Sequence, residues 1–226
     1  MKEVRQNKKN HLSSKQTFAN AKELADWQNR LTQLWDENHN TPPQKLGEGD
    51  KDNWQALLTQ NHSHNFQLWL HEDKARREDM GFSYVYQAKR AIDAHNQQRN
   101  NMIELMDEIL YTHFLIDENQ KNGVMHSETP GMIIDRLSIL SLKCFYMNKQ
   151  SLRQDVGFEH KKKCEEKTRI LKLQRQHLIE ALEVLFADIK SRKCFFRIYK
   201  QMKMISFTEA SISKKILNLS SHVNLW

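Results

Sequence analysis

The chain of 226 residues is poor in the residue types that build disulfide frameworks and membrane spans. It has three cysteines, Cys144, Cys164 and Cys194, which are far apart and include no Cys-x-x-Cys pair. We therefore expect buried or idle thiols in a reducing compartment rather than disulfides. No run approaches the roughly 20 apolar residues that a membrane-spanning helix needs.

The first fourteen residues also lack the features of a secretory signal. They are polar and carry four basic side chains, with no apolar segment behind them. We expect this N-terminus to be disordered and the protein to be cytoplasmic, either free or bound at the membrane surface.

Glycine and proline are scarce, with six and three residues, and most of them fall between segments of helical periodicity. Thr129 and Pro130 are typical of an N-cap and a first helical residue, and Ser206-Phe-Thr-Glu209 is a capping box ahead of a last short helix. Apolar residues recur at steps of three and four elsewhere. The pattern predicts long helices over residues 15–37, 52–79, 83–118, 129–148 and 158–189.

The fold class that follows is all-α, an antiparallel bundle of about five long helices plus a short C-terminal helix. Residues 1–14 form the polar N-terminus, residues 15–204 the helical bundle domain, and residues 205–226 a divergent C-terminal extension. Sustained period-two alternation, which would indicate a sheet, is missing. We find no internal repeat.

Polar residues interrupt the apolar stripes of three of these helices. The helix that begins at Pro130 is apolar nearly all round, which predicts burial, yet Asp135 and Arg136 stand in its first turns. Burying either charge unpaired costs several kcal/mol, so each requires a partner on another helix. Arg76, Arg77 or Arg99 are candidates for Asp135, and Glu72, Asp73, Glu104 or Asp107 for Arg136.

Two interpretations fit these polar positions. One is a structural ion-pair network that fixes helix register, and the other is a ligand or catalytic cavity between helices, where bundles build their sites. The candidate site on the second interpretation comprises Asn65, Glu72, Asp73, Arg76, Asn96, Arg99, Asp135 and Arg136.

The motifs of several enzyme classes are missing. The sequence has no Gly-rich phosphate loop and no His-Glu-x-x-His, and no glutamate is followed by histidine three residues later, as a di-iron bundle requires. We assign no metal and no cofactor. A weaker hypothesis is that Mg²⁺ binds Glu72, Asp73, Glu104 and Asp107, in the manner of helical nucleotide pyrophosphohydrolases.

Positive charge is concentrated at the C-terminal end. Residues 190–226 hold eight lysines and arginines against Glu209 alone, which accounts for the net charge of +7 of the whole chain. The 195–205 stretch interleaves cations with aromatic residues, so it either continues the preceding helix or packs back as a separate amphipathic helix. Alternatively, it is a surface for anionic lipid or a polyanionic glycan precursor. No nucleic-acid module accompanies it. This basic surface comprises Lys190, Arg192, Lys193, Arg197, Lys200 and Lys203.

Three strings carry a resemblance to a known family. They begin at His64, Asp93 and Glu128, and the last, Glu-Thr-Pro-Gly-Met-Ile-Ile-Asp-Arg-Leu-Ser-Ile-Leu, is fairly specific. The chain resembles, over about residues 25–204, an uncharacterised bacterial family of all-helical proteins of unknown function. Its members are often encoded among lipopolysaccharide or surface-polysaccharide glycosyltransferase genes. The resemblance implies a helical fold and a polysaccharide setting, and it supplies no mechanism.

Three functions are compatible with these observations. The first is an accessory protein or enzyme of surface-polysaccharide assembly with a polar site between helices, working with other glycan-assembly proteins. The second is a non-catalytic scaffold or adaptor at an anionic membrane surface, and the third a Mg²⁺-dependent hydrolase of nucleotides or nucleotide sugars. The sequence determines neither a reaction nor an oligomeric state.

Overall fold

The computed structural model describes residues 20–38, 42, 53–116 and 122–202. Within them the prediction of an all-α fold is confirmed. The predicted disordered residues 1–14 and the predicted short helix and extension after residue 205 lie outside the described residues. The five long helices are α1 (Ala21–Glu37), α2 (Trp54–Ala75), α3 (Phe82–His113), α4 (Pro130–Ser151) and α5 (Phe158–Lys190).

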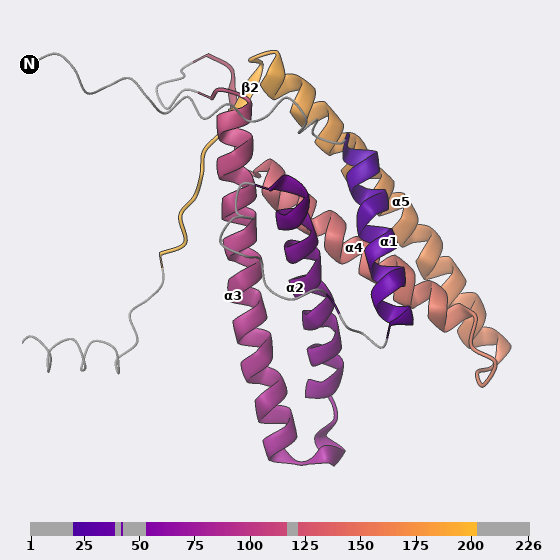
Figure 1. The fold of residues 1–226 in the computed structure, drawn as a ribbon. Helices are drawn as coiled ribbons and strands as arrows, with labels where there is room; N and C mark the ends of the chain where they lie inside the picture. The colour runs from indigo at the N-terminus through magenta and orange to yellow at the C-terminus, as the bar shows by residue number, and fades with distance from the viewer. Residues whose placement is uncertain (1–19, 39–41, 43–52, 117–121, 203–226) are drawn as a thin grey trace, which may run out of the picture.

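The helices form two antiparallel hairpins that are inclined to each other (Figure 1). The pair α2–α3, connected through the short 3₁₀ helix η2 (Glu78–Met80), makes one hairpin, and α4–α5 makes the other. Helix α1 packs against α4, α5 and α2, and α4 also contacts both α2 and α3. The two hairpins therefore meet along α4, which is the element most enclosed by others.

Side-chain caps set where three of the helices begin. Asn20 and Asn53 cap α1 and α2, each accepting a hydrogen bond from a backbone N–H three residues later. Thr129 caps α4 in the same way, with Pro130 at the first helical position. These caps satisfy N–H groups that the helix itself leaves unpaired, and the last confirms the predicted start of α4.

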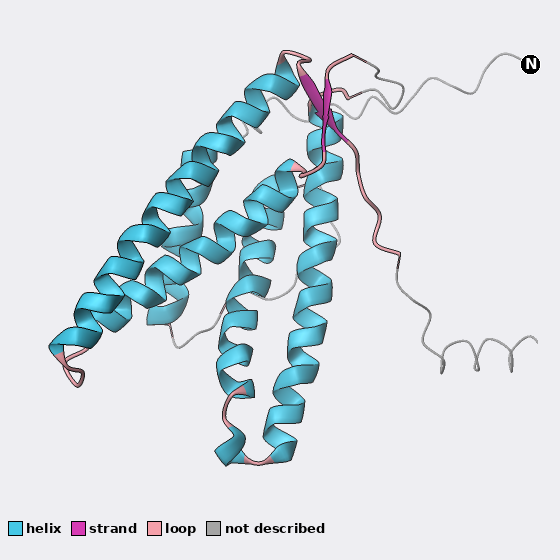
Figure 2. Cartoon of the chain, turned by 180° about the vertical axis from the view of Figure 1, so that it is seen from behind, coloured by secondary structure: helices cyan, strands magenta, loops and turns pink. Residues whose placement is uncertain are grey.

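Residues 191–202, the part of the C-terminal basic segment that the structure describes, are not helical, so the prediction of a helix there is wrong. Cys194–Phe196 forms a strand, β2, paired in parallel with β1 (Val124–His126), with Val124 opposite Cys194. Figure 2 shows the pair at the end of the molecule where α3 and α5 finish. All three β2 residues are buried, and burying Phe195 and Phe196 against the helices outweighs the local helical preference. The partner strand lies about 70 residues away along the chain, so periodicity in one segment gives no sign of it.

One large apolar core joins all five helices to β2. A smaller cluster of Leu31, Trp35, Phe66 and Leu142 lies between α1, α2 and α4. Among the helices that the structure describes, none combines the length and the apolarity that a bilayer crossing requires.

The start of α4 is fastened to α3 by a buried carboxylate. Asp107 is 3% exposed and accepts hydrogen bonds from Thr129 Oγ1 at 2.5 Å and from the backbone N–H of Gly131 at 2.7 Å. A Cβ on Gly131 would lie 2.6 Å from an oxygen of Asp107, so only glycine allows this approach. A negative group at a helix N-terminus is favourable, and this contact sets the distance between α3 and α4.

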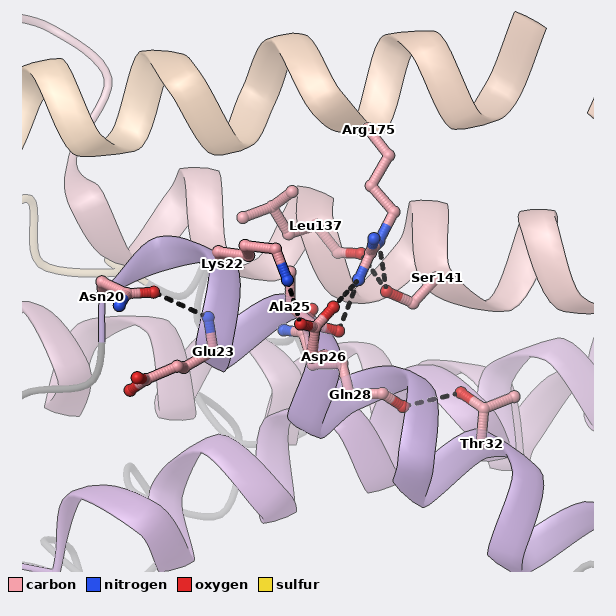
Figure 3. Close-up of polar contacts among 10 residues, drawn as sticks. All are labelled: Asn20, Lys22, Glu23, Ala25, Asp26, Gln28, Thr32, Leu137, Ser141 and Arg175. Carbon is pink, nitrogen blue, oxygen red and sulfur yellow. Dashed lines mark hydrogen bonds and ion pairs between the residues drawn. The ribbon is translucent and has the colours of Figure 1, made fainter. Parts of the chain in front are cut away.

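A partly buried arginine joins α5 to α1 and α4 (Figure 3). Arg175 donates to the backbone oxygen of Ala25 at 2.5 Å and to Ser141 Oγ at 3.2 Å, and lies 3.9 Å from Asp26. Its side chain is 14% exposed, and burial lowers the pKa of the guanidinium. Helix α1 is therefore held to the rest of the protein by polar as well as apolar contacts.

Candidate functional site

A buried carboxylate is the centre of a polar network between α2, α3 and α4. Asp135 is 5% exposed, and its Oδ1 accepts hydrogen bonds from Nδ2 of Asn61 at 2.9 Å and of Asn65 at 2.8 Å. Nη1 of Arg99 lies 3.6 Å from the other carboxylate oxygen and donates to Oδ1 of Asn65 at 3.5 Å. The charge of Asp135 is thus balanced by one cation and two amide donors, as a buried charge requires.

The network continues inward to α1 through a histidine. His62 is fully buried, with Ser138 Oγ 2.8 Å from its Nδ1 and Thr32 Oγ1 2.8 Å from its Nε2. Thr32 donates its proton to the backbone oxygen of Gln28, so it accepts from Nε2–H. We therefore assign the Nε2–H tautomer, in which Nδ1 accepts from Ser138.

Because it is buried, His62 is neutral near neutral pH. Burial lowers its pKa from 6.5 to about 3. The contact between Ser138 and His62 has the residue types of a nucleophile and its base, but both side chains are 0% exposed. No substrate reaches either group in this conformation, and we assign them a structural role.

A cleft of about 280 Å³ opens above this network, between α2, α3 and α4. Arg99 and Asn65 belong to both, because they bind Asp135 or its neighbours on one side and line the cleft on the other. We call it the central cleft. Its lining residues are Asn65, Leu68, Trp69, Glu72, Asp73, Arg76, Asn96, Arg99, Ile139, Leu142 and Lys143.

Acidic and basic side chains are mixed around the central cleft. Asp73 and Arg76 form an exposed ion pair at 2.9 Å, and Glu72 lies 3.9 Å from Lys89 on α3. Trp69 stacks on Tyr146 of α4 with ring centroids 5.0 Å apart and an angle of 6° between the planes. The cleft thus has a fixed aromatic wall and a rim of both charges.

The structure places six predicted residues together on the lining of the central cleft: Asn65, Glu72, Asp73, Arg76, Asn96 and Arg99. Asp135 lies beneath the lining and contacts it through Asn65 and Arg99. That these residues bind a ligand stays a prediction, whereas their proximity is an observation.

Arg136 does not belong to this group, and the expectation that it is buried against another helix is wrong. Its side chain is 53% exposed and pairs with Glu128 in the segment just before α4. The neighbouring Asp135 faces α2 and α3 because adjacent residues on a helix are rotated by about 100°. Among the arginines considered as partners of Asp135, Arg99 is the one that meets it, while Arg76 and Arg77 pair with Asp73 and Asp79.

The four carboxylates considered for Mg²⁺ have separate partners. Glu104 binds Lys200 at 2.6 Å, and Asp107 binds the start of α4. Glu72 and Asp73 stand at the central cleft instead. Within the described residues, no three His, Cys, Asp or Glu side chains are arranged to hold a metal ion.

Most of the described cations of the predicted basic surface bind protein groups. Lys200 contacts both Glu104 and Glu108 on α3, and Lys193 lies 3.6 Å from Asp188. Arg192 donates to the backbone oxygen of Leu115, and Arg197 lies over the ring of Phe195. Lys190 lines a separate pocket beside α3 and α5, and Lys203 lies outside the described residues. These contacts use much of the segment's charge to fasten it to α3 and α5.

Two polar residues that join helices, His62 and Arg175, escaped prediction although the sequence carries a signal for each. His62 stands four residues from both Leu58 and Phe66, which are core residues. Arg175 stands four residues after Leu171 and three before Leu178, inside the apolar stripe of α5. A polar residue in register with a stripe is the same signal that identified Asp135.

Comparison with known proteins identifies one family. Residues 55–198, from α2 to just beyond β2, match a family described as "Protein of unknown function (DUF4254)". Neither a curated protein nor a solved structure matches the chain. The match covers every residue that lines the central cleft.

Proposed function

We propose, for a chain that belongs to the DUF4254 family of proteins of unknown function, that the central cleft binds a sugar-containing ligand. The protein on this proposal is an accessory protein or enzyme of surface-polysaccharide assembly. The cleft supports the class of ligand, and the resemblance to proteins encoded among surface-polysaccharide genes supports the setting.

Preorganised polar groups are the observation that carries the proposal. Asp135 fixes the amide of Asn65 and the guanidinium of Arg99 from below, and both residues line the cleft. The amide of Asn65 is buried and its N–H groups bind Asp135 and Ser138, so the guanidinium of Arg99, with its side chain 25% exposed, is the group that a ligand contacts. A ligand therefore meets a donor that is already oriented, which reduces the entropy lost on binding. A network that served helix register alone would not require its outermost members to line a cleft.

The chemistry of the lining suits a hydroxyl-rich molecule. Hydroxyl groups both donate and accept, and the cleft offers carboxylates, amides and guanidinium groups that do one or both. The charges nearly balance, because Arg99 is offset by Asp135 and Arg76 by Asp73. Trp69, held by Tyr146, presents an apolar face of the kind on which the C–H face of a sugar ring packs.

Ligand-observed NMR with a panel of free hexoses and N-acetylhexosamines tests this directly. We expect at least one sugar to bind the wild type. We expect Trp69→Ala and Arg99→Gln each to weaken binding by about tenfold. This is the loss in affinity that follows from removing one aromatic contact or one charged hydrogen bond. Tyr86→Ala and Arg90→Gln are matched controls on the exposed surface of α3, and they leave binding unchanged.

Asp135→Asn tests whether Asp135 orients Arg99 for binding, separately from its effect on the stability of the fold. The amide keeps the shape of the side chain but removes the charge that holds Arg99, so we expect weaker sugar binding in a protein that stays folded. Absence of binding by every sugar in the panel, or equal losses in the cleft and control variants, contradicts the proposal.

A further inference from the structure

A second depression lies on the other side of α4, and its lining differs from that of the central cleft. It has a volume of about 560 Å³ and lies between α4 and α5. Its lining includes Arg136, Lys143 and His177 and contains no acidic residue. We call it the α4–α5 groove. The other lining residues are Ile139, Leu140, Gln174 and Leu178.

The groove and the central cleft are contiguous. Ile139 and Lys143, one helical turn apart on α4, line both. We call these two side chains the ridge between the cleft, which lies against α2 and α3, and the groove, which lies against α5. A ligand seated in the cleft needs to pass only this ridge to enter the groove.

The groove is arranged to attract an anion. Arg136 and Lys143 are seven residues apart, so their backbones are about 10 Å apart along the helix axis, and His177 faces them from α5. Among the described residues no acidic side chain forms an ion pair with Lys143. Arg136 pairs with Glu128, but both side chains are partly exposed, and such pairs contribute at most about 1 kcal/mol. Its guanidinium has five N–H donors, so an incoming anion can bind beside Glu128 or replace it.

We propose that the α4–α5 groove binds a phosphate or diphosphate group that is attached to the sugar in the central cleft. This inference rests on the proposed function and deepens it, because it makes the ligand a phosphorylated sugar rather than a free one. Lys143 stands on the ridge at the junction, where it contacts the link between the two parts. Arg136, which the sequence placed in the candidate polar site with the residues of the central cleft, then binds the phosphate instead.

Binding measured by calorimetry with four kinds of probe tests the proposal. The probes are the free hexoses, the corresponding hexose 1-phosphates, a hexuronic acid and inorganic pyrophosphate alone. We expect pyrophosphate to bind the wild type, and the hexose 1-phosphate to bind about tenfold more tightly than its free sugar, as one or two charged contacts provide. The hexuronic acid is the carboxylate probe. We expect its affinity to exceed that of the free hexose by less than the affinity of the hexose 1-phosphate does.

Arg136→Gln is the decisive variant because Arg136 lines the groove and not the cleft. We expect it to remove most of the advantage of the phosphorylated sugar and to leave the free sugar unchanged, whereas Trp69→Ala weakens both. Arg169→Gln removes the same charge from an exposed site on α5 and has no effect. Equal melting temperatures verify that these variants are folded.

The two proposals fail in different ways. If free sugars bind but phosphorylation adds nothing, or if Arg136→Gln weakens both ligands equally, the groove proposal is overturned while the sugar site stands. A hexuronic acid that gains as much as the phosphate overturns the assignment of phosphate. If no sugar binds, the proposed function fails. If pyrophosphate does not bind either, the proposal that the groove binds phosphate fails as well.

Discussion

One buried side chain of the polar network, His62, makes the stability of the protein depend on pH in the acid range. The pKa is lowered from 6.5 to about 3 in the folded protein because the imidazole is buried, whereas the unfolded chain titrates near 6.5. The unfolded state therefore binds a proton that the folded state does not bind, and folding stability falls as the pH drops below about 6.5. Burial also lowers the pKa values of His71, His95 and His113, which adds loss in the same direction.

We predict that His62→Gln removes part of this acid sensitivity. The wild type should lose about 1.4 kcal/mol per pH unit through His62 as the pH falls from 6.5 toward 3, and the variant should lack this contribution although it is less stable at pH 7. Urea denaturation at pH 4.5, 5.5, 6.5 and 7.5 measures the slopes. If both proteins show the same slope, His62 is not held neutral by the fold.

The pH dependence of stability that Asp107 contributes has the opposite sign to that of His62. Burial raises its pKa from 3.8 to about 6, despite the hydrogen bonds from Thr129 and Gly131 that lower it. The folded state holds a proton between about pH 4 and 6 that the unfolded state has released. Its contribution to stability is therefore complete below about pH 4 and is lost as the pH rises through 6.

Asp107→Asn should abolish that contribution. We expect the wild type to gain stability over the variant by up to about 3 kcal/mol between pH 7 and pH 4, because the variant has no proton to take up. The same denaturation series gives the difference at each pH. A difference that does not change with pH contradicts the raised pKa of Asp107.

At the scale of elements, the contact between α3 and the start of α4 determines how closely the two helices approach. The absent side chain of Gly131 leaves room for the carboxylate of Asp107, and Thr129 both caps α4 and donates to the same carboxylate. Because Asp135 follows only one turn later, this contact also sets how far that residue stands from α2 and α3.

Gly131→Ala therefore tests the fit of α4 against α3. Its Cβ would lie 2.6 Å from an oxygen of Asp107 and 2.9 Å from the backbone oxygen of Ile103, so the helices must separate, at a cost of about 1–3 kcal/mol. Gly157→Ala at the start of α5 is the control, since nothing lies within 4 Å of its Cβ position, and it should change stability by less than about 1 kcal/mol. Chemical denaturation of both variants gives the comparison, and equal effects would show that the close approach does not constrain α4.

At the scale of the whole molecule, two helical hairpins and α1 meet along α4. The surfaces of α4 toward α2 and α3 bear the polar network and the central cleft, and its surface toward α5 bears the groove. Arg175 then joins α5 to α1 and α4 across the opposite side. The position of the site therefore depends on contacts that join all five helices.

We expect Arg175→Met to loosen α1. Methionine fills similar space but leaves Ser141 and the backbone oxygen of Ala25 without their donor, at a cost of about 2 kcal/mol. Hydrogen exchange should show faster opening of α1 amides, and denaturation a lower free energy of unfolding. Arg169→Met, on the exposed face of α5, is the matched control. If both variants change α1 exchange and the free energy of unfolding equally, Arg175 does not hold α1 to α5.

The sequence by itself determined the helical class and most helix limits. Periodicity, scarce glycine and proline, and the Thr129-Pro130 start are local features, and helix formation depends on local spacing. It also selected six residues that share the central cleft, because a polar residue in register with an apolar stripe must lie near other helices. Each of these predictions needs information from one helix only.

Only the tertiary structure decided which partners those residues meet. Asp135 and Arg136 are adjacent in sequence, yet one faces α2 and α3 and the other pairs with Glu128 at the edge of the groove. The strand β2 exists because β1 lies beside it, and His62 is neutral because three helices enclose it. Pairing, burial and the course of the cleft depend on contacts between distant segments, and no single segment's periodicity carries that information.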